Sequence, residues 1–157
     1  MPAITAILHT HNDELRLGRA LETARPCDEI LVVDHGSVDA TAQVAREYGA
    51  TICAGLDSHA AAQCAHHPWL LFLQPNESIS EALEASLFEW KLYLTEDVEQ
   101  ISACSLFVRE ENAGVWSEPI PETRLVPSNW SVWDGFLPQP WRASMLLQGD
   151  ILRFREP

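Results

Sequence analysis

Two short apolar runs, each ending abruptly in polar residues, constrain the fold of this chain most strongly. Residues 4–8 run into the polar stretch 9–14, and residues 30–33 run into 34–37. Uninterrupted apolar runs are typical of strands that are buried on both faces of a parallel sheet, and the carboxyl ends of such strands meet at a binding crevice. A helical pattern over residues 17–24 separates the runs. We therefore expect two adjacent parallel strands whose polar ends lie side by side.

The same alternation continues toward the middle of the chain. A helix capped by Asp39 or Ser37 is predicted to end before Gly49, and a third strand is predicted at 51–54. Ser58 can begin a short alanine-rich helix, after which residues 69–73 form another apolar run. Strands alternating with helices predict a parallel sheet with right-handed crossovers.

The second half begins with a clear helix and then changes character. Residues 78–81 form a capping-box pattern ahead of a helix whose buried face carries Leu83, Leu87, Trp90 and Leu94. A strand is predicted at 101–108, and a turn at 112–114. From Trp116 onward prolines and tryptophans replace helical periodicity, which favours short edge strands and loops, with a closing hairpin at 146–152.

Size and composition exclude several classes of protein. The 157 residues suit one domain, and 46% apolar content without a long uncharged stretch argues against a membrane-spanning segment. No basic region precedes the first apolar run, so we expect no secretory signal and a cytoplasmic location. The net charge of −13 argues against nucleic acid as a partner. Four scattered cysteines, at 27, 53, 64 and 104, are expected to be structural thiols, and three of them lie in apolar or helical contexts where a free cysteine is usually buried.

Two motifs at the predicted strand ends resemble those of a known family. They read Thr10-His11-Asn12-Asp13-Glu14 and Val33-Asp34-His35-Gly36-Ser37-Val38-Asp39-Ala40-Thr41. Both are similar to the strand-end motifs of the family 2 glycosyltransferases of the GT-A type, including those of lipopolysaccharide-core biosynthesis. The resemblance is strong from about residue 3 to residue 54. It implies an α/β fold with a mostly parallel nucleotide-binding sheet flanked by helices, followed by an irregular, aromatic-rich C-terminal β and loop region.

The resemblance also implies an organisation and a binding site. A single domain, 1–157, would contain a nucleotide-binding half, 1–77, and a helix with a degenerate acceptor-side half, 78–157. The implied nucleotide-binding residues are Thr10, Asn12, Glu14, Asp34, Gly36 and Ser37. A carboxylate at a strand end can accept the imide N–H of uracil. The alternative stays open that Asp34 and Asp39 only satisfy backbone donors at a turn and a helix cap.

The metal motif departs from the family pattern. Family members follow the fourth strand with an Asp-x-Asp-like element, whose carboxylates hold the Mg²⁺ or Mn²⁺ that binds the donor diphosphate. This chain has Leu73-Gln74-Pro75-Asn76-Glu77. Amide oxygens are weaker ligands for such cations than carboxylates. Glu77 and Asn76 are the remaining candidate ligands, and Glu77 can instead serve the helix that follows.

The catalytic base is altered as well. Residues 118–126 are similar to the family segment in which an upstream acid deprotonates the acceptor hydroxyl, and Ile120 takes the place of that acid. Glu118 or Glu122 could serve only if the loop shifts its register, because a general base must reach its proton. Residues 129–135 resemble the next family element but lack the His-Glu that usually follows.

Two groups of side chains allow further interpretations. His9, His11 and His35 could bind a transition metal, or they could simply form a polar, solvated rim. Four tryptophans could stack on sugar rings or close the core of a loop-rich region. These are Trp116, Trp130, Trp133 and Trp141.

Three hypotheses for function follow. The chain is a small glycosyltransferase that takes a nucleotide-sugar donor such as a UDP-sugar, with Mg²⁺ or Mn²⁺, and transfers the sugar to a hydroxyl acceptor. Alternatively, it is a degenerate relative that binds nucleotide without turnover, and then needs no cation. The third hypothesis is a scaffold for protein contacts, for example as a homo-oligomer. The altered motifs leave open whether the chain is an enzyme.

Overall fold

The computed structural model describes residues 2–93, 103–142 and 144–157. The helices are α1 (Leu17–Glu22), α2 (Thr41–Glu47), α3 (Ser58–Cys64) and α4 (Glu81–Tyr93). The strands are β1 (Ile4–Thr10), β2 (Glu29–Asp34), β3 (Thr51–Ala54), β4 (Trp69–Phe72), β5 (Glu77–Ile79), β6 (Cys104–Asn112), β7 (Val115–Trp116), β8 (Ile120–Pro127), β9 (Trp133–Asp134), β10 (Leu137–Pro138) and β11 (Met145–Phe154).

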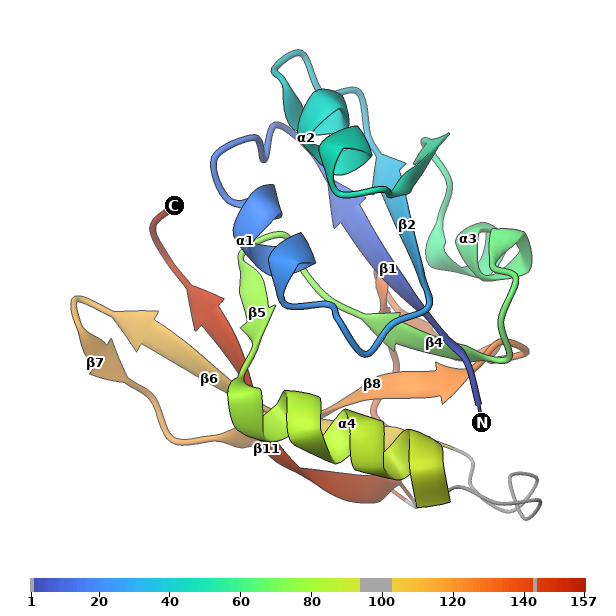
Figure 1. The fold of residues 1–157 in the computed structure, drawn as a ribbon, viewed down its shortest axis with the longest axis vertical. Helices are drawn as coiled ribbons and strands as arrows, with labels where there is room; N and C mark the ends of the chain where they lie inside the picture. The colour runs from blue at the N-terminus through green and yellow to red at the C-terminus, as the bar shows by residue number, and fades with distance from the viewer. Residues whose placement is uncertain (1, 94–102, 143) are drawn as a thin grey trace.

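The N-terminal half of the sheet is parallel, as predicted (Figure 1). Its strands run in the order β3-β2-β1-β4, and every neighbouring pair is parallel. The register pairs Thr10 with Asp34 at the carboxyl ends of β1 and β2. The two polar strand ends therefore lie side by side, as the two apolar runs predict.

The C-terminal half is more regular than the sequence suggests. The sheet continues as β4-β8-β6-β11-β5, and β8 lies in its middle, antiparallel to both β4 and β6. The prediction of short edge strands is wrong for β8 and β11, although β7, β9 and β10 are only two residues long. The strand predicted at 101–108 is β6, which extends to Asn112 and turns at Ala113 and Gly114, both with positive φ. Residues 94, 101 and 102 of the predictions lie outside the described residues.

The hairpin predicted at 146–152 is wrong. This segment belongs to β11, a ten-residue strand that pairs in parallel with β6 and shifts its register between Leu146 and Asp150. Gly149 lies in this shift with φ of 96°, and a Cβ atom there would come within 2.2 Å of the backbone nitrogen of Leu83 in α4. The glycine thus marks a bulge that lets the helix approach, instead of a turn that reverses the chain.

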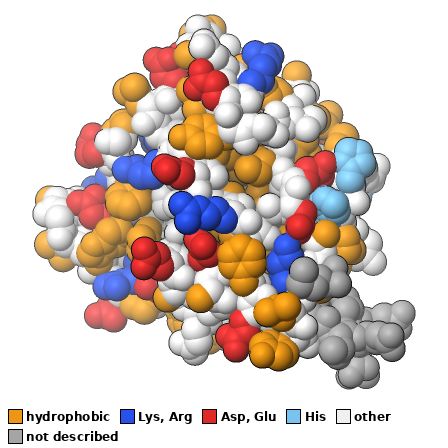
Figure 2. All heavy atoms as spheres, viewed as in Figure 1, with side chains coloured by type: hydrophobic (Ala, Val, Ile, Leu, Met, Phe, Trp, Pro, Cys, Tyr) orange, Lys and Arg blue, Asp and Glu red, His pale blue; other side chains and the backbone are white. Residues whose placement is uncertain are grey.

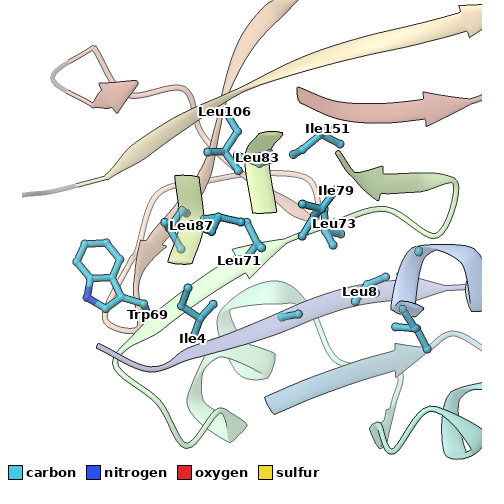
Figure 3. Packing of buried hydrophobic residues seen from close by; sticks show 14 of the residues in the cluster. Ile4, Leu8, Trp69, Leu71, Leu73, Ile79, Leu83, Leu87, Leu106 and Ile151 are labelled. Carbon is cyan, nitrogen blue, oxygen red and sulfur yellow. The ribbon is translucent and has the colours of Figure 1, made fainter. Parts of the chain in front are cut away.

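Alternating side chains of the parallel strands feed two apolar clusters. One face of the sheet carries α1, α2 and α4, and the other carries α3 and the segment around Trp130. In Figure 3, Leu83 and Leu87 of α4 lie among the strand residues Leu71, Leu106 and Ile151. Because this larger cluster draws on β1, β4, β6 and β11, the two halves of the sheet share one core.

Helix starts differ in detail from the predictions. The residue before α2 is Ala40, whose side chain makes no cap, but Asp39 Oδ1 accepts the N–H of Thr41, the first residue of α2, at 2.9 Å. Asp39 thus satisfies a backbone donor at the start of α2, whereas the Ser37 hydroxyl bonds to Asp34. Ser78 lies in β5, and it is Ser80 whose hydroxyl accepts the N–H of Leu83 in the first turn of α4. The Ser78 hydroxyl is buried without a hydrogen-bond partner among the described residues, so it takes no part in a cap.

The charged side chains of the surface and the cysteine thiols do not determine the fold. Figure 2 shows acidic and basic side chains close together on the face viewed there. Cys104 is buried and Cys27 and Cys53 are half-buried, whereas Cys64 is exposed. In the part of the chain that the structure describes, no helix has the length and apolar character needed to span a bilayer.

Candidate functional site

A pocket of about 340 Å³ opens at the carboxyl ends of the parallel strands. Residues 9–11, Asp13 and His35 line it from the ends of β1 and β2, and residues 72–76 line it from the end of β4. Arg16 reaches it from the loop before α1, and residues 136–137 reach it from the β9–β10 hairpin. This volume falls in the range of small-molecule sites. Binding crevices of parallel α/β sheets are found at this edge. The pocket is thus a candidate ligand site.

The first motif contacts the second next to the pocket through hydroxyl and carboxylate groups. The Thr10 hydroxyl donates to Asp34 Oδ1 at 2.9 Å, and the Ser37 hydroxyl donates to the same oxygen at 2.5 Å. The backbone N–H of Ser37 donates to Asp34 Oδ2 at 3.1 Å. Burial alone would raise the pKa of Asp34, but these hydrogen bonds outweigh it and hold the pKa below its usual range.

Further bonds connect the two loops. The side-chain oxygen of Asn12, a residue with φ of 53°, accepts the N–H of Val38 at 2.9 Å, and Glu14 Oε2 accepts the N–H of Ala40 at 3.0 Å. The Thr41 hydroxyl accepts the N–H of Asp13 at 2.8 Å. We call the set Thr10, Asn12, Glu14, Asp34, Ser37, Asp39 and Thr41 the loop-bridging cluster.

The structure brings the six residues predicted to bind nucleotide together, but it gives most of them local partners. Thr10 is the member that lines the pocket, and Gly36 provides the positive φ, 73°, that the turn after Asp34 requires. Both oxygens of Asp34 accept hydrogen bonds from within the loop-bridging cluster. The contacts of Asp34 are those of the turn alternative, and its position beside the pocket is what the family resemblance implies.

The histidines form an ordered chain of hydrogen bonds against an aromatic ring. The Ser58 hydroxyl donates to the carbonyl of Phe136 at 2.6 Å, so it must accept from His9 Nε2 at 2.8 Å. His9 Nδ1 is then the acceptor for His35 Nε2, 2.9 Å away. The Phe136 ring stacks on both imidazoles, with centroid distances of 4.0 Å to His9 and 4.8 Å to His35.

Burial and the neighbouring charge keep His9 neutral. Desolvation, followed by the proximity of His35, lowers the pKa of His9 to about 4. Among the described residues, no three His, Cys, Asp or Glu side chains are grouped to hold a metal. The histidines therefore form part of the pocket wall.

The altered metal motif divides between two environments. Gln74 and Asn76 line the pocket, whereas Glu77 in β5 is completely buried behind it. Arg124 of β8 is also completely buried and donates to both Glu77 oxygens at 2.8 Å, and Arg153 of β11 donates to Glu77 Oε2 at 3.0 Å. Burial acts to raise the pKa of Glu77, but the arginines and the N–H of Gln74 hold it below its usual range.

The two candidate bases lie away from the pocket lining. Glu122 accepts from Arg124 at 3.1 Å and lies 3.5 Å from Arg153. We call Glu77, Glu122, Arg124 and Arg153 the buried ion-pair cluster, although Glu122 lies at its solvent edge with 31% exposure. Glu118 is exposed in the segment between β7 and β8.

Asp13, Arg16 and Phe136 are among the pocket residues that the sequence did not single out. Asp13 and Arg16 lie in the segment that links the first motif to α1, and Phe136 follows the segment that resembles the aromatic family element. Only the position of Asp13 within the first motif could have indicated its role. Arg16 and Phe136 reach the pocket through loop conformations that no local pattern encodes.

The tryptophans mainly close the core, although one remains partly exposed. Trp130 is buried and packs edge-on against Trp141 at a centroid distance of 5.5 Å, while Trp133 packs against Phe72. Trp116 packs against Phe154. Trp141 is 42% exposed. None of the four lines the pocket, so sugar stacking there is not their role in this structure.

Comparison with known proteins agrees with the motifs. No protein-family model matches the chain. An uncharacterized glycosyltransferase of Rickettsia typhi is 30% identical over 92 residues, which cover 54% of this chain and 31% of that protein. The lipopolysaccharide core biosynthesis glycosyltransferase LpsC of Rhizobium meliloti is 32% identical over 98 residues, covering 55% of this chain and 36% of LpsC. The chain thus spans about a third of the length of these curated relatives.

The fold has solved counterparts. The crystal structure of S. aureus TarS matches with a TM-score of 0.55 and 18% identity, over 74% of this chain and 23% of that chain. A shorter TarS structure, residues 1–349, matches with a TM-score of 0.54. This likeness concerns the fold alone. Sequence and fold together make this chain a relative of the glycosyltransferases with the GT-A fold.

Proposed function

We propose that this chain binds a nucleotide-sugar donor in the pocket at the ends of β1, β2 and β4 and transfers the sugar to a hydroxyl acceptor. The observation that carries the proposal is the position of the pocket between the two family motifs, in a chain whose relatives are glycosyltransferases. The acceptor and the sugar are not specified by the residues that line it.

The lining of the pocket supports a nucleotide as ligand. Phe136 is 47% exposed and presents an aromatic surface, while Thr10, Gln74 and Asn76 add polar groups. Aromatic stacking together with a few directed hydrogen bonds is how proteins bind a base without excess charge. Asp34 lies beside Thr10 at the end of β2. An incoming imide N–H could replace the hydroxyl of Ser37 as the hydrogen-bond partner of Asp34. A uridine nucleotide is therefore the first donor to test.

For the general base we retain Glu118 and Glu122 as candidates. Glu122 is held by two arginines, so it could act only after releasing them. Glu118 is exposed and is the freer of the two. Because neither lines the pocket, the acceptor would have to bind beside the donor, toward the β7–β8 segment.

Binding of UDP, UDP-glucose and GDP, measured by calorimetry, tests the proposal. Thermal unfolding gives a second measurement, because a ligand at a hundred times its dissociation constant should raise the free energy of unfolding by ~2.7 kcal/mol. We expect UDP and UDP-glucose to bind, and Asn76→Trp, which fills the pocket, to abolish the binding. Gln43→Trp, at an exposed position of α2, is the matched control and should bind like the unaltered chain. Failure of every nucleotide to bind would refute the proposal.

Turnover is measured separately. Release of UDP from UDP-glucose in the presence of hydroxyl acceptors would support the transferase. The neutral side chains at 74 and 76 favour the second candidate function, nucleotide binding without transfer. Binding of UDP-glucose with no release of UDP under any metal condition would support that candidate instead.

A further inference from the structure

The residues at the family metal motif do not suit a divalent cation. Gln74 and Asn76 offer only amide oxygens to the pocket, and Glu77 is completely buried between two arginines. Mg²⁺ and Mn²⁺ prefer carboxylate ligands and carry a charge that nearby guanidinium groups repel. Recruiting Glu77 would leave the buried guanidinium of Arg124 without its carboxylate, which is strongly unfavourable.

A diphosphate nevertheless needs positive charge in this acidic chain. The sequence carries 23 acidic residues against 10 lysines and arginines. Its net charge of −13 repels an anionic ligand unless a local cation compensates. In family members that compensation comes from the bound metal. Here it must come from the lining of the pocket itself.

Arg16 is in the right place to provide it. Within the described residues, it is the one arginine or lysine that lines the pocket, and Asp13 is the one carboxylate. Arg16 Nε lies 3.4 Å from Asp13 Oδ1, and the arginine side chain is 32% exposed. No hydrogen bond of its two terminal nitrogens is found among residues 2–93, 103–142 and 144–157. Those nitrogens are the atoms with which arginine binds phosphate oxygens in a bidentate manner.

We propose that the pocket binds the diphosphate of its nucleotide ligand without a divalent cation, and that the guanidinium of Arg16 takes the place of the metal. This inference rests on the proposed nucleotide-sugar function. Asp13 orients Arg16, because its other oxygen is fixed by the N–H of His11 at 2.8 Å. The guanidinium is always charged at physiological pH, so the site stays cationic without a bound ion.

The test is a set of calorimetric titrations with UDP and with uridine. The unaltered chain should bind UDP equally well, within twofold, in EDTA, in Mn²⁺ and in Mg²⁺. Arg16→Ala should weaken the affinity for UDP at least tenfold. It should leave the affinity for uridine unchanged, because uridine has no phosphate. Arg16→Lys should recover part of the loss. Arg46→Ala, at an exposed position in the last turn of α2, is the matched control and should bind both ligands normally.

Each alternative outcome identifies the statement that fails. UDP binding that requires Mn²⁺ or Mg²⁺ would overturn the inference and leave the proposed function standing. The role of Arg16 would be refuted if Arg16→Ala did not weaken the binding of UDP in EDTA. It would also be refuted if this variant lost affinity for UDP and for uridine equally. If UDP and uridine fail to bind under all conditions, the proposed function fails as well. Thermal unfolding of every variant shows whether it is folded.

Discussion

The loop-bridging cluster and the buried ion-pair cluster stabilise neighbouring parts of the sheet in different ways. The first joins the ends of β1 and β2 through hydroxyls, backbone N–H groups and carboxylates that are partly exposed. The second joins β5, β8 and β11 through full charges, and two of its members, Glu77 and Arg124, have no solvent exposure. Hydrogen bonds near solvent can exchange partners at low cost, whereas a buried charge that loses its partner cannot be solvated.

This difference indicates which side chains remain available for a ligand. A substrate that reaches the loop-bridging cluster can replace a hydroxyl partner of Asp34. A metal that reaches Glu77 would have to displace two arginines. Glu77, the carboxylate that ends the altered motif, is therefore part of the buried framework of this chain.

Breaking the buried pair should have the largest effect. We expect Glu77→Gln to lower the free energy of unfolding by about 3–5 kcal/mol, because it leaves the guanidinium of Arg124 buried without a counter-charge. Urea denaturation followed by circular dichroism measures the loss. Glu110→Gln, at the exposed end of the same group of ion pairs, is the control. A loss below about 1 kcal/mol would show that the buried charges are not what stabilises this region.

Removing the central carboxylate of the loop-bridging cluster should cost less. Asp34→Ala takes away the acceptor of three hydrogen bonds, and we expect a loss of about 1–3 kcal/mol. The same variant should abolish the binding of uridine nucleotides if Asp34 contacts the base. Unchanged UDP affinity in folded Asp34→Ala would limit Asp34 to its structural role.

The histidine chain predicts a pH dependence of stability. The pKa of His9 is about 4 in the folded state, against an ordinary 6.5, so the unfolded state binds the proton more tightly. Stability should be complete above about pH 6.5 and fall as the pH is lowered toward 4. We expect a loss of about 1–2 kcal/mol, less than the full shift would give because the ring is partly solvated.

Denaturation at several pH values measures this effect against His9→Gln. In the variant, the free energy of unfolding should no longer fall between pH 6.5 and 4. Its separate fall at lower pH should remain, because that comes from carboxylates with a lowered pKa, such as Asp34. Equal slopes in both proteins would contradict the assignment to His9.

The exposed rim of the ion-pair region should contribute least. Arg155 Nε lies 3.1 Å from Glu110 Oε1, but the arginine is 58% exposed. We expect Arg155→Ala to change the free energy of unfolding by less than about 0.5 kcal/mol, and the difference to vanish in high salt. A change above 1 kcal/mol would show that this exposed pair stabilises the fold together with the buried ion-pair cluster.

The parallel half could be predicted from the sequence because its signals are local. Apolar runs that end in polar residues fixed the approximate limits of β1, β2 and β4, and Gly49, with φ of 77°, marked the end of α2. The pairing of Thr10 with Asp34 followed from the common direction of parallel strands. The two motifs therefore lie at the edge of the sheet where the pocket opens.

The antiparallel half depends on contacts between distant residues. Pro121 and Pro127 in β8 suggested an irregular segment, yet this strand pairs on both sides in the middle of the sheet. The burial of Arg124 against Glu77, which is 47 residues away in the sequence, has no local signature. Arg16 was missed for the same reason, because its position in the pocket depends on loops from three other segments.

In the short loop from Gln74 to Glu77, the groups that hold the turn differ from the side chains that line the pocket. Its turn is fixed by the N–H of Gln74, which donates to Glu77 Oε1 at 2.7 Å, and by the N–H of Glu77, which donates to the carbonyl of Gln74 at 3.0 Å. The side chains at 74 and 76 take no part in these bonds. A change of the side chain at 74 or 76 therefore leaves both hydrogen bonds of the turn in place, so the polarity of the pocket lining can vary without loss of the backbone shape.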